Sequence, residues 1–257
     1  MAQALHEKSN LKSIVSEDEW RVRVDLAAAY RLVDYYGWTD MIFTHLSARV
    51  PGPEHHFLIN PYGMMFHEVT ASSLVKIDLE GNIVLHNGYD INPAGFCIHS
   101  AVHMSREDAK AVMHLHTDDG VAVSAMEEGL MPITQTAMVL HDEVAYHEFE
   151  GVALDLGERE RLIKDIGDKS LLMLRNHGTL SVGETVSECF LKLYNFERAC
   201  TMQVKALASG NLHHPSKRAI ETTRKQGKML LASGELDSLA WPALLRLLDG
   251  RDNSFRL

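Results

Sequence analysis

Apolar residues recur at helical spacing through residues 16–37. Ser16 with Glu19 three positions later forms a capping box, and Gly37 is a typical helix terminator, so this segment predicts an amphipathic helix. A second capping box opens a longer helical pattern over residues 185–210, which also ends on a glycine. The pattern therefore predicts two long helices that flank the central part of the chain.

Short apolar and β-branched runs bounded by Gly, Pro and Asn lie between these helices and predict strands. The predicted strands cover residues 41–50, 55–60, 74–84, 111–117, 143–151 and 170–183. Further helices are predicted over residues 95–105, 118–126, 158–167, 216–232 and 242–250. Hairpin signals with flanking helices, without regular strand–helix alternation, predict an α/β domain whose central sheet is largely antiparallel.

Nothing along the chain marks a domain boundary, because it has no repeat, no low-complexity tract and no linker. A chain of 257 residues with 46% hydrophobic content is long enough to bury one substantial core. We therefore expect a single domain over residues 1–257.

The charge balance narrows the classes of partner. The chain has 25 Lys and Arg against 35 Asp and Glu, a formal charge of −10, which disfavours binding to nucleic acid or an anionic membrane.

The N-terminal residues lack the apolar stretch of a signal peptide, and no apolar run approaches the roughly 18 residues of a membrane span. The three cysteines are too few for a disulfide framework. We expect a cytoplasmic protein.

Two histidines, His114 and His116, stand one residue apart in an apolar run. On a strand they share a face, whereas on a helix their rings would diverge by roughly 200°. Zinc accepts neutral histidine nitrogens, and a catalytic zinc typically has three protein ligands and an open position. The pair is therefore a candidate half of a metal site, and the alternative is two polar residues on a half-exposed strand.

A third histidine, His177, follows another apolar run and precedes Gly178. Glycine at a strand end allows the backbone to approach a site closely. We therefore expect His177 to be the third ligand of a divalent metal ion.

Several segments resemble the class II aldolase/adducin family. They are "HLH" and "RNHG", together with "LINPYG", "TASSLVKIDLEG", "NPAGFCIHSAVH" and "LHDEVAYHEFEG". The resemblance covers residues 17–210 and is strongest to the adducin-head branch. It implies a three-layer α/β/α sandwich around a largely antiparallel sheet, with residues 211–257 as a helical extension. It also implies that His114, His116 and His177 hold a divalent ion, for which we expect zinc, and that the protein is a homotetramer with sites near subunit interfaces.

One catalytic position differs from the family's enzymes. Their aldolases have a Glu, and their epimerases an Asp, four residues before a helix histidine. If that histidine is His99, the carboxylate's position is Gly95, and glycine cannot transfer a proton. His99 lies one turn away and is our candidate replacement, as a base or a fourth ligand; the alternative is a histidine packed under the sheet. Glu143, where the epimerases place an acid/base residue, is the second catalytic candidate.

The expected substrate also differs from a sugar phosphate. The family's phosphate-binding Gly-Asn turn and Ser-Ser pair correspond to His-Leu at 45–46 and Pro-Ala at 93–94. Thr44 and Ser47 remain as candidate substrate-binding side chains. Asn176 is a third, unless it only stabilises its turn. We expect a non-phosphorylated or differently held substrate.

The sequence therefore indicates a metal-dependent aldolase-type enzyme that acts on a small hydroxylated carbonyl compound. Aldol cleavage, epimerisation and decarboxylation share an enediolate intermediate, and the sequence does not choose among them. The alternative is a non-catalytic adducin-head-like module for oligomerisation or partner binding, with a structural or vestigial metal. A catalytic metal site keeps an open coordination position and a structural site does not, so a fourth side-chain ligand would favour the module.

Overall fold

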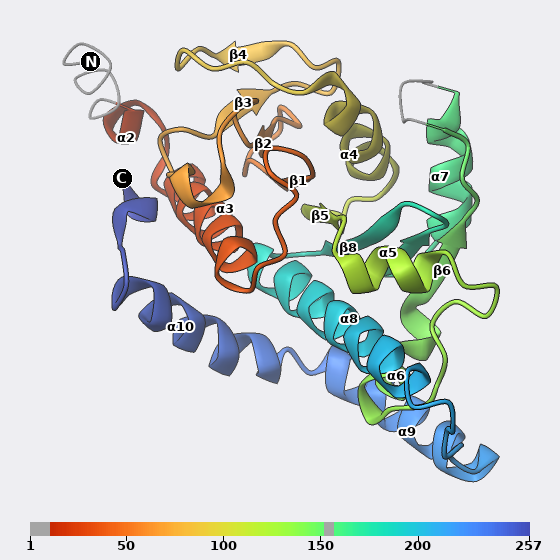
Figure 1. Cartoon of the computed structure of the whole chain (residues 1–257). Helices are drawn as coiled ribbons and strands as arrows, with labels where there is room; N and C mark the ends of the chain where they lie inside the picture. Colours follow the sequence, from red (N-terminus) through yellow and green to blue (C-terminus); the bar gives the residue numbers. More distant parts are fainter. Residues whose placement is uncertain (1–10, 152–156) are drawn as a thin grey trace.

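One eight-stranded sheet, in the order β4-β3-β2-β1-β5-β8-β7-β6, forms the centre of the structure (Figure 1). The computed structural model describes residues 11–151 and 157–257, without the side chains of residues 93–97, 235 and 236. The strands are β1 (His45–Arg49), β2 (Phe57–Ile59), β3 (Val75–Ile77), β4 (Ile83–Leu85), β5 (Ala111–Leu115), β6 (Val144–His147), β7 (Leu171–Leu174) and β8 (Gly178–Gly183). Every neighbouring pair is antiparallel except β6 and β7, which confirms the predicted fold class.

Helices cover both faces of this sheet. They are α2 (Leu11–Ile14), α3 (Glu17–Tyr35), α4 (Pro93–Ser105), α5 (Asp118–Ser124), α6 (Gln135–Leu140), α7 (Glu158–Ile166), α8 (Val186–Leu207), α9 (Lys217–Ala232) and α10 (Glu235–Asp249), with 3₁₀ turns η1 (Phe66–Glu68), η2 (His141–Glu143) and η3 (Ser254–Arg256). α3 and α8 share one buried apolar cluster with β1 and β5, and α10 packs outside them. α4 and α7 share another cluster with β5, β7 and β8 on the opposite face.

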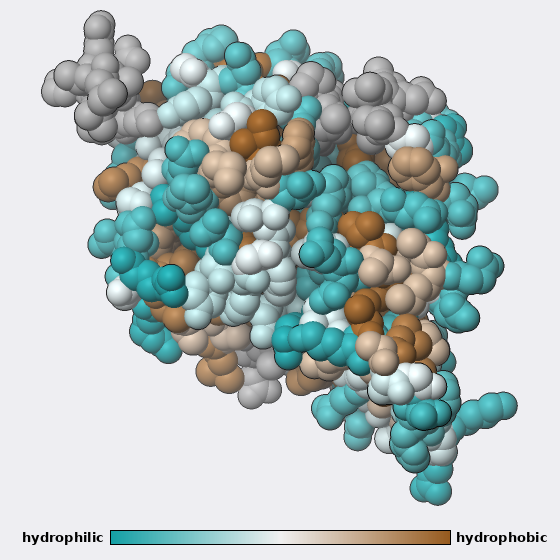
Figure 2. Space-filling view, viewed as in Figure 1, coloured by the Kyte–Doolittle hydropathy of each residue, from teal (hydrophilic) through white to brown (hydrophobic). Residues whose placement is uncertain are grey.

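The alternation of side chains along β5 separates these two clusters. Met113 and Leu115 are buried on the α3 and α8 side, whereas Val112 packs with residues of α4 and α7 on the other. Successive residues of a strand point to opposite faces, so His114 lies on the same side of the sheet as α4. Figure 2 shows small apolar patches over α5 and α6 on a mostly hydrophilic face.

The predicted capping signals mark the starts of both long helices. The Ser16 hydroxyl accepts the backbone N–H of Glu19 at 3.1 Å, and the Thr185 hydroxyl accepts that of Glu188 at 3.1 Å. The Glu19 carboxylate does not complete a capping box, because it is buried and bonded to Arg23 Nε at 2.9 Å. Of the two bonds in the predicted capping box, only the one accepted by Ser16 forms, and the Glu19 side chain makes a buried ion pair instead.

Several features of the fold differ from the sequence-based expectation, among them α10, which was predicted over residues 242–250 and begins at Glu235 with Pro242 inside it. α6 was not predicted, because six residues are too few to show helical periodicity, although Thr134 caps it by accepting the N–H of Ala137 at 3.2 Å. The predicted strand at 41–50 begins only at His45, because Met41 and Thr44 have positive φ angles of 47° and 65°. Within the part of the chain that the structure describes, no helix is long and apolar enough to cross a bilayer.

Candidate metal centre

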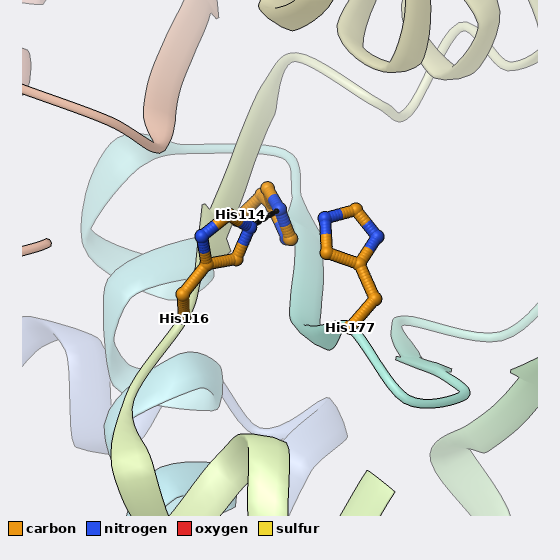
Figure 3. A group of neighbouring side chains, drawn as sticks. All are labelled: His114, His116 and His177. Carbon is orange, nitrogen blue, oxygen red and sulfur yellow. Dashed lines mark hydrogen bonds between the residues drawn. The ribbon is translucent and has the colours of Figure 1, made fainter. Parts of the chain in front are cut away.

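His114, His116 and His177 come together at the C-terminal end of β5 and the turn between β7 and β8, as the sequence predicted (Figure 3). His114 lies in β5, His116 follows its last residue, and His177 lies in the turn that joins β7 to β8. One ring nitrogen of each lies within 4.8 Å of the others. The Nε2 atoms of His114 and His116 are 2.9 Å apart.

Two of the rings are oriented by groups that can only accept a hydrogen bond. His114 Nδ1 lies 2.9 Å from the backbone oxygen of Thr179, and His116 Nδ1 lies 3.1 Å from Asp40 Oδ2. Each Nδ1 therefore donates, and each Nε2 of the neutral ring keeps its lone pair. Two lone pairs 2.9 Å apart repel each other, and a shared cation removes that repulsion. Such outer partners are typical of histidines that bind metals, so the donor set suits a divalent ion.

The residues on either side of His177 explain its position. Asn176 has a φ of 56°, a left-handed conformation that Asn tolerates better than most residues. A Cβ on Gly178 would overlap the backbone oxygen of Leu115 and lie 3.3 Å from His116 Cδ2. Glycine at this position therefore lets the turn that carries His177 lie directly against the end of β5.

The surroundings of the trio favour neutral imidazoles. Burial, and then the charges of His177 and His116, hold the pKa of His114 well below its usual value of 6.5. Burial, and then the charges of His116 and His147, lower the pKa of His177 to about 4. Metal ligation requires unprotonated histidine, so these two rings are ready to bind an ion at neutral pH.

The trio has no fourth protein ligand among the side chains that the structure describes. In particular, His99 does not belong to this group of donor atoms, and its Nδ1 instead lies 2.6 Å from Ser47 Oγ on β1. The predicted use of His99 as a fourth ligand therefore has no support within the chain. A three-histidine site with an open position is typical of catalytic rather than structural zinc.

His99 ends a chain of buried hydrogen bonds. His103 Nδ1 lies 2.8 Å from the backbone oxygen of Ala109 and must donate to it, so His103 Nε2 accepts from Ser47 Oγ at 2.7 Å. The Ser47 oxygen then accepts from His99 Nδ1. This order leaves the lone pair of neutral His99 on Nε2, which is buried and has no partner within the described part of the chain.

His45 lies between this chain of bonds and the trio. It pairs with His114 in the register of β1 and β5, so the two rings share the α4 side of the sheet. Its ring centroid is 6.0 Å from that of His99, and burial first, then the charge of His116, lowers its pKa to about 4. Neighbouring Thr44 is buried with no hydrogen-bond partner for Oγ1 among the described residues.

Two other predicted residues, Glu143 and Asn176, do not have the expected contacts with the trio. Glu143 lies before the first residue of β6 and accepts from Ser170 Oγ at 2.8 Å, whereas His147 at the last residue of β6 lies on the side of His177. Within one chain, Glu143 is therefore at the opposite end of the strand. Asn176 is exposed, and within the described residues its side-chain amide makes no hydrogen bond that would hold His177. Its contribution here is the conformation of the turn.

The sequence did not predict the groups that orient His114 and His116. Asp40 lies in an isolated bridge with Phe43 and contributes a carboxylate from a segment with no recognisable motif. Thr179 contributes a backbone oxygen, which any residue type would offer. The contact with Thr179 could have been found from its position, because residue 179 follows His177 by two places on the strand that pairs with β5.

Comparisons with known proteins identify relatives of this chain and of its fold. The family model described as "Class II Aldolase and Adducin N-terminal domain" matches residues 24–204. A Caulobacter vibrioides protein whose name places it provisionally in aldolase class 2 is 61% identical over 242 residues, which cover 93% of each chain. Mouse alpha-adducin is 43% identical over 89% of this chain, which spans only 33% of that protein. An L-fuculose 1-phosphate aldolase structure from Glaciozyma antarctica has a TM-score of 0.80 and 27% identity, covering 94% of this chain and 93% of that one.

Proposed function

The chain belongs to the class II aldolase and adducin family, and we propose that it is a metal-dependent enzyme of the aldolase type. Its substrate is a small hydroxylated carbonyl compound, and its compartment is the cytoplasm. The observation that carries the proposal is the trio of histidines with an open fourth position among the described side chains. An adducin-head-like module would not need that open position.

His114, His116 and His177 hold the ion, for which we propose zinc. Once bound, it would polarise a substrate carbonyl and the hydroxyl beside it, as a Lewis acid does. Asp40 and Thr179 keep two of the rings in the orientation that presents Nε2. The chain's contribution is thus a rigid set of donors on β5 and on the turn before β8.

We assign the role of proton acceptor to His99, in place of the carboxylate that Gly95 lacks. The bonds through Ser47 fix the lone pair on Nε2, and the ring lies on the same side of the sheet as the trio. Since His99 Nε2 is enclosed, the packing around the ring must open when substrate binds. Glu143 can take part only from a neighbouring subunit, which fits the homotetramer that we propose.

The substrate that we propose carries no phosphate. Arg49, the cation nearest to the predicted binding residues in sequence, is already bonded to Glu107 at 3.1 Å and to the backbone oxygen of His103. Ser47 is likewise engaged by two imidazoles, whereas Thr44 Oγ1 is buried without a partner among the described residues. A substrate with neutral hydroxyl groups therefore suits this site better than one with a phosphate dianion.

The test is the metal content of the purified protein, by elemental analysis, for wild type, His116→Ala and His214→Ala. His214 is an exposed histidine far along the sequence and serves as the control. We expect about one divalent ion per chain in wild type and the control, and its loss in His116→Ala. Chelation should change the melting temperature little, since an open functional site is not a structural one.

Two outcomes would contradict the proposal. A wild-type protein without bound metal, or one that unfolds when chelator removes its metal, would favour the partner-binding module. A positive result justifies screening hydroxy-carbonyl substrates for cleavage, epimerisation and decarboxylation.

A further inference from the structure

Glu197 on α8 is a buried acid that the proposed chemistry does not use. Its side chain is 1% exposed, and both carboxylate oxygens accept hydrogen bonds from threonine hydroxyls. Thr117 donates to Oε2 and Thr179 donates to Oε1. Burial raises the pKa of Glu197 to about 7, partly offset by the two threonine bonds. Burying a carboxyl group costs stability, so its place in the core calls for a specific role.

Both threonines are directly connected to the metal ligands. Thr117 follows His116 in the sequence, and Thr179 lies two residues after His177. The backbone oxygen of Thr179 also accepts the Nδ1 hydrogen of His114. One carboxylate therefore ties together the two chain segments that supply all three ligands.

The packing around this carboxylate leaves little freedom for the segments to shift. A Cβ on Gly120 would lie 2.7 Å from Thr117 Oγ1, 3.0 Å from Glu197 Oε2 and 3.1 Å from Thr179 Cγ2. The same Thr117 hydroxyl accepts the N–H of Gly120 at 3.0 Å and so caps α5. The start of α5, the start of β8 and the middle of α8 thus meet at one buried acid.

We propose that Glu197 is a positioning residue of the metal centre, which sets the affinity for the ion by fixing His116, His177 and His114 through Thr117 and Thr179. This inference rests on the proposed function, because it assumes that the trio binds a divalent ion. Glu197 itself does not touch the ion or the substrate. Loss of an outer partner typically weakens metal binding by about 10–100-fold.

The test compares Zn²⁺ affinity, by competition with a chromophoric chelator, among wild type, Glu197→Gln and Thr179→Val. Glu197→Gln places an amide opposite two hydroxyl donors, and Thr179→Val removes one hydroxyl but keeps the backbone oxygen that His114 needs. The control is Thr201→Val, which deletes a similar hydroxyl bond from α8, to Asp119 Oδ2 at 2.6 Å, that does not involve Thr117 or Thr179.

We expect both test variants to bind Zn²⁺ about 10–100-fold more weakly and Thr201→Val to bind it as wild type does. At saturating Co²⁺ the absorption bands of the two test variants should also shift, because the ligands no longer hold the same geometry. The melting temperature of each metal-free variant separates this effect from a loss of folding. If Glu197→Gln does not fold, Thr179→Val alone decides.

Unchanged Zn²⁺ affinity and Co²⁺ spectra in both variants would overturn the inference, as would an equal loss of affinity in Thr201→Val. Either result leaves the proposed function intact, because wild type still binds metal. A wild-type protein that binds no Zn²⁺ would instead refute the proposed function and, with it, this inference.

Discussion

Single residues determine where the rings of His114, His116 and His177 lie and how they are oriented. The spacing of His114 and His116 and the glycine after His177 were enough to predict that the three histidines converge, because these patterns are local. Asp40 and Glu197 could not be predicted in the same way, since each acts through contacts with residues far away in the sequence. The polar network around His99 was also invisible, because a helix histidine looks the same whether it meets water or Ser47.

The buried histidines of α4 make stability depend on pH. Burial holds the pKa of His99 well below 6.5, and burial together with the charge of Arg49 lowers that of His103 to about 4. Between about pH 4 and 6.5 the unfolded chain therefore binds protons that the folded chain does not. The free energy of unfolding should fall as the pH drops through this window. Urea unfolding at several pH values, with chelator present, measures it.

Two variants should change this slope in opposite directions. His103→Gln removes one group that takes up a proton only in the unfolded chain. It should therefore reduce the slope of the unfolding free energy against pH by about 1.4 kcal/mol per pH unit. Glu197, with its pKa raised to about 7, keeps a proton in the folded state that the unfolded state loses above pH 4.5, so Glu197→Gln should steepen it. Identical slopes in all three proteins would contradict the assignment of neutral, buried imidazoles.

At the scale of elements, buried polar groups fix how α3 meets the sheet. Arg23 is fully buried and donates to the backbone oxygens of Ala71 and Leu74 at 3.2 and 2.8 Å. Glu19 pairs with it at 2.8 Å and also with Lys76 of β3 at 2.8 Å. The sequence predicted the start of this helix correctly but assigned Glu19 to its cap, because a capping pattern does not reveal which way the side chain turns.

Glu19→Ala should therefore destabilise the protein by about 3–5 kcal/mol, because it leaves a buried guanidinium without its counter-charge. Glu17→Ala is the matched control on the same helix turn, since its pair with Arg21 at 2.6 Å is solvent-exposed. An exposed pair of this kind contributes about 0–1 kcal/mol. Chemical denaturation gives both values, and similar losses in the two variants would contradict the buried network.

At the scale of the whole molecule, the class of fold was predictable and the strand order was not. Hairpin signals predicted antiparallel pairing, which the structure has everywhere except between β6 and β7. That pair is parallel because α7 crosses between the two strands, and a parallel connection needs such a crossover. Pairing of β5 with both β1 and β8 joins segments whose contact no local pattern encodes.

The homotetramer stays a prediction at this scale. Glu143 lies at the end of β6 away from His177, so a shared site is the one arrangement that brings it to the trio. Sedimentation velocity at micromolar concentration should give the mass of four chains. A mass of one chain would exclude Glu143 from the chemistry.

The distance along the sequence between the two ligand-bearing segments has a consequence for how the protein is made. His114 and His116 leave the ribosome long before His177, and the turn that carries His177 packs against the end of β5 only when β8 has paired with it. A nascent chain that lacks β8 thus offers two histidines and no complete set of ligands. If the trio binds the ion that we propose, the complete set of donors forms only after β8 has been synthesised, while α8, α9 and α10 are still to follow.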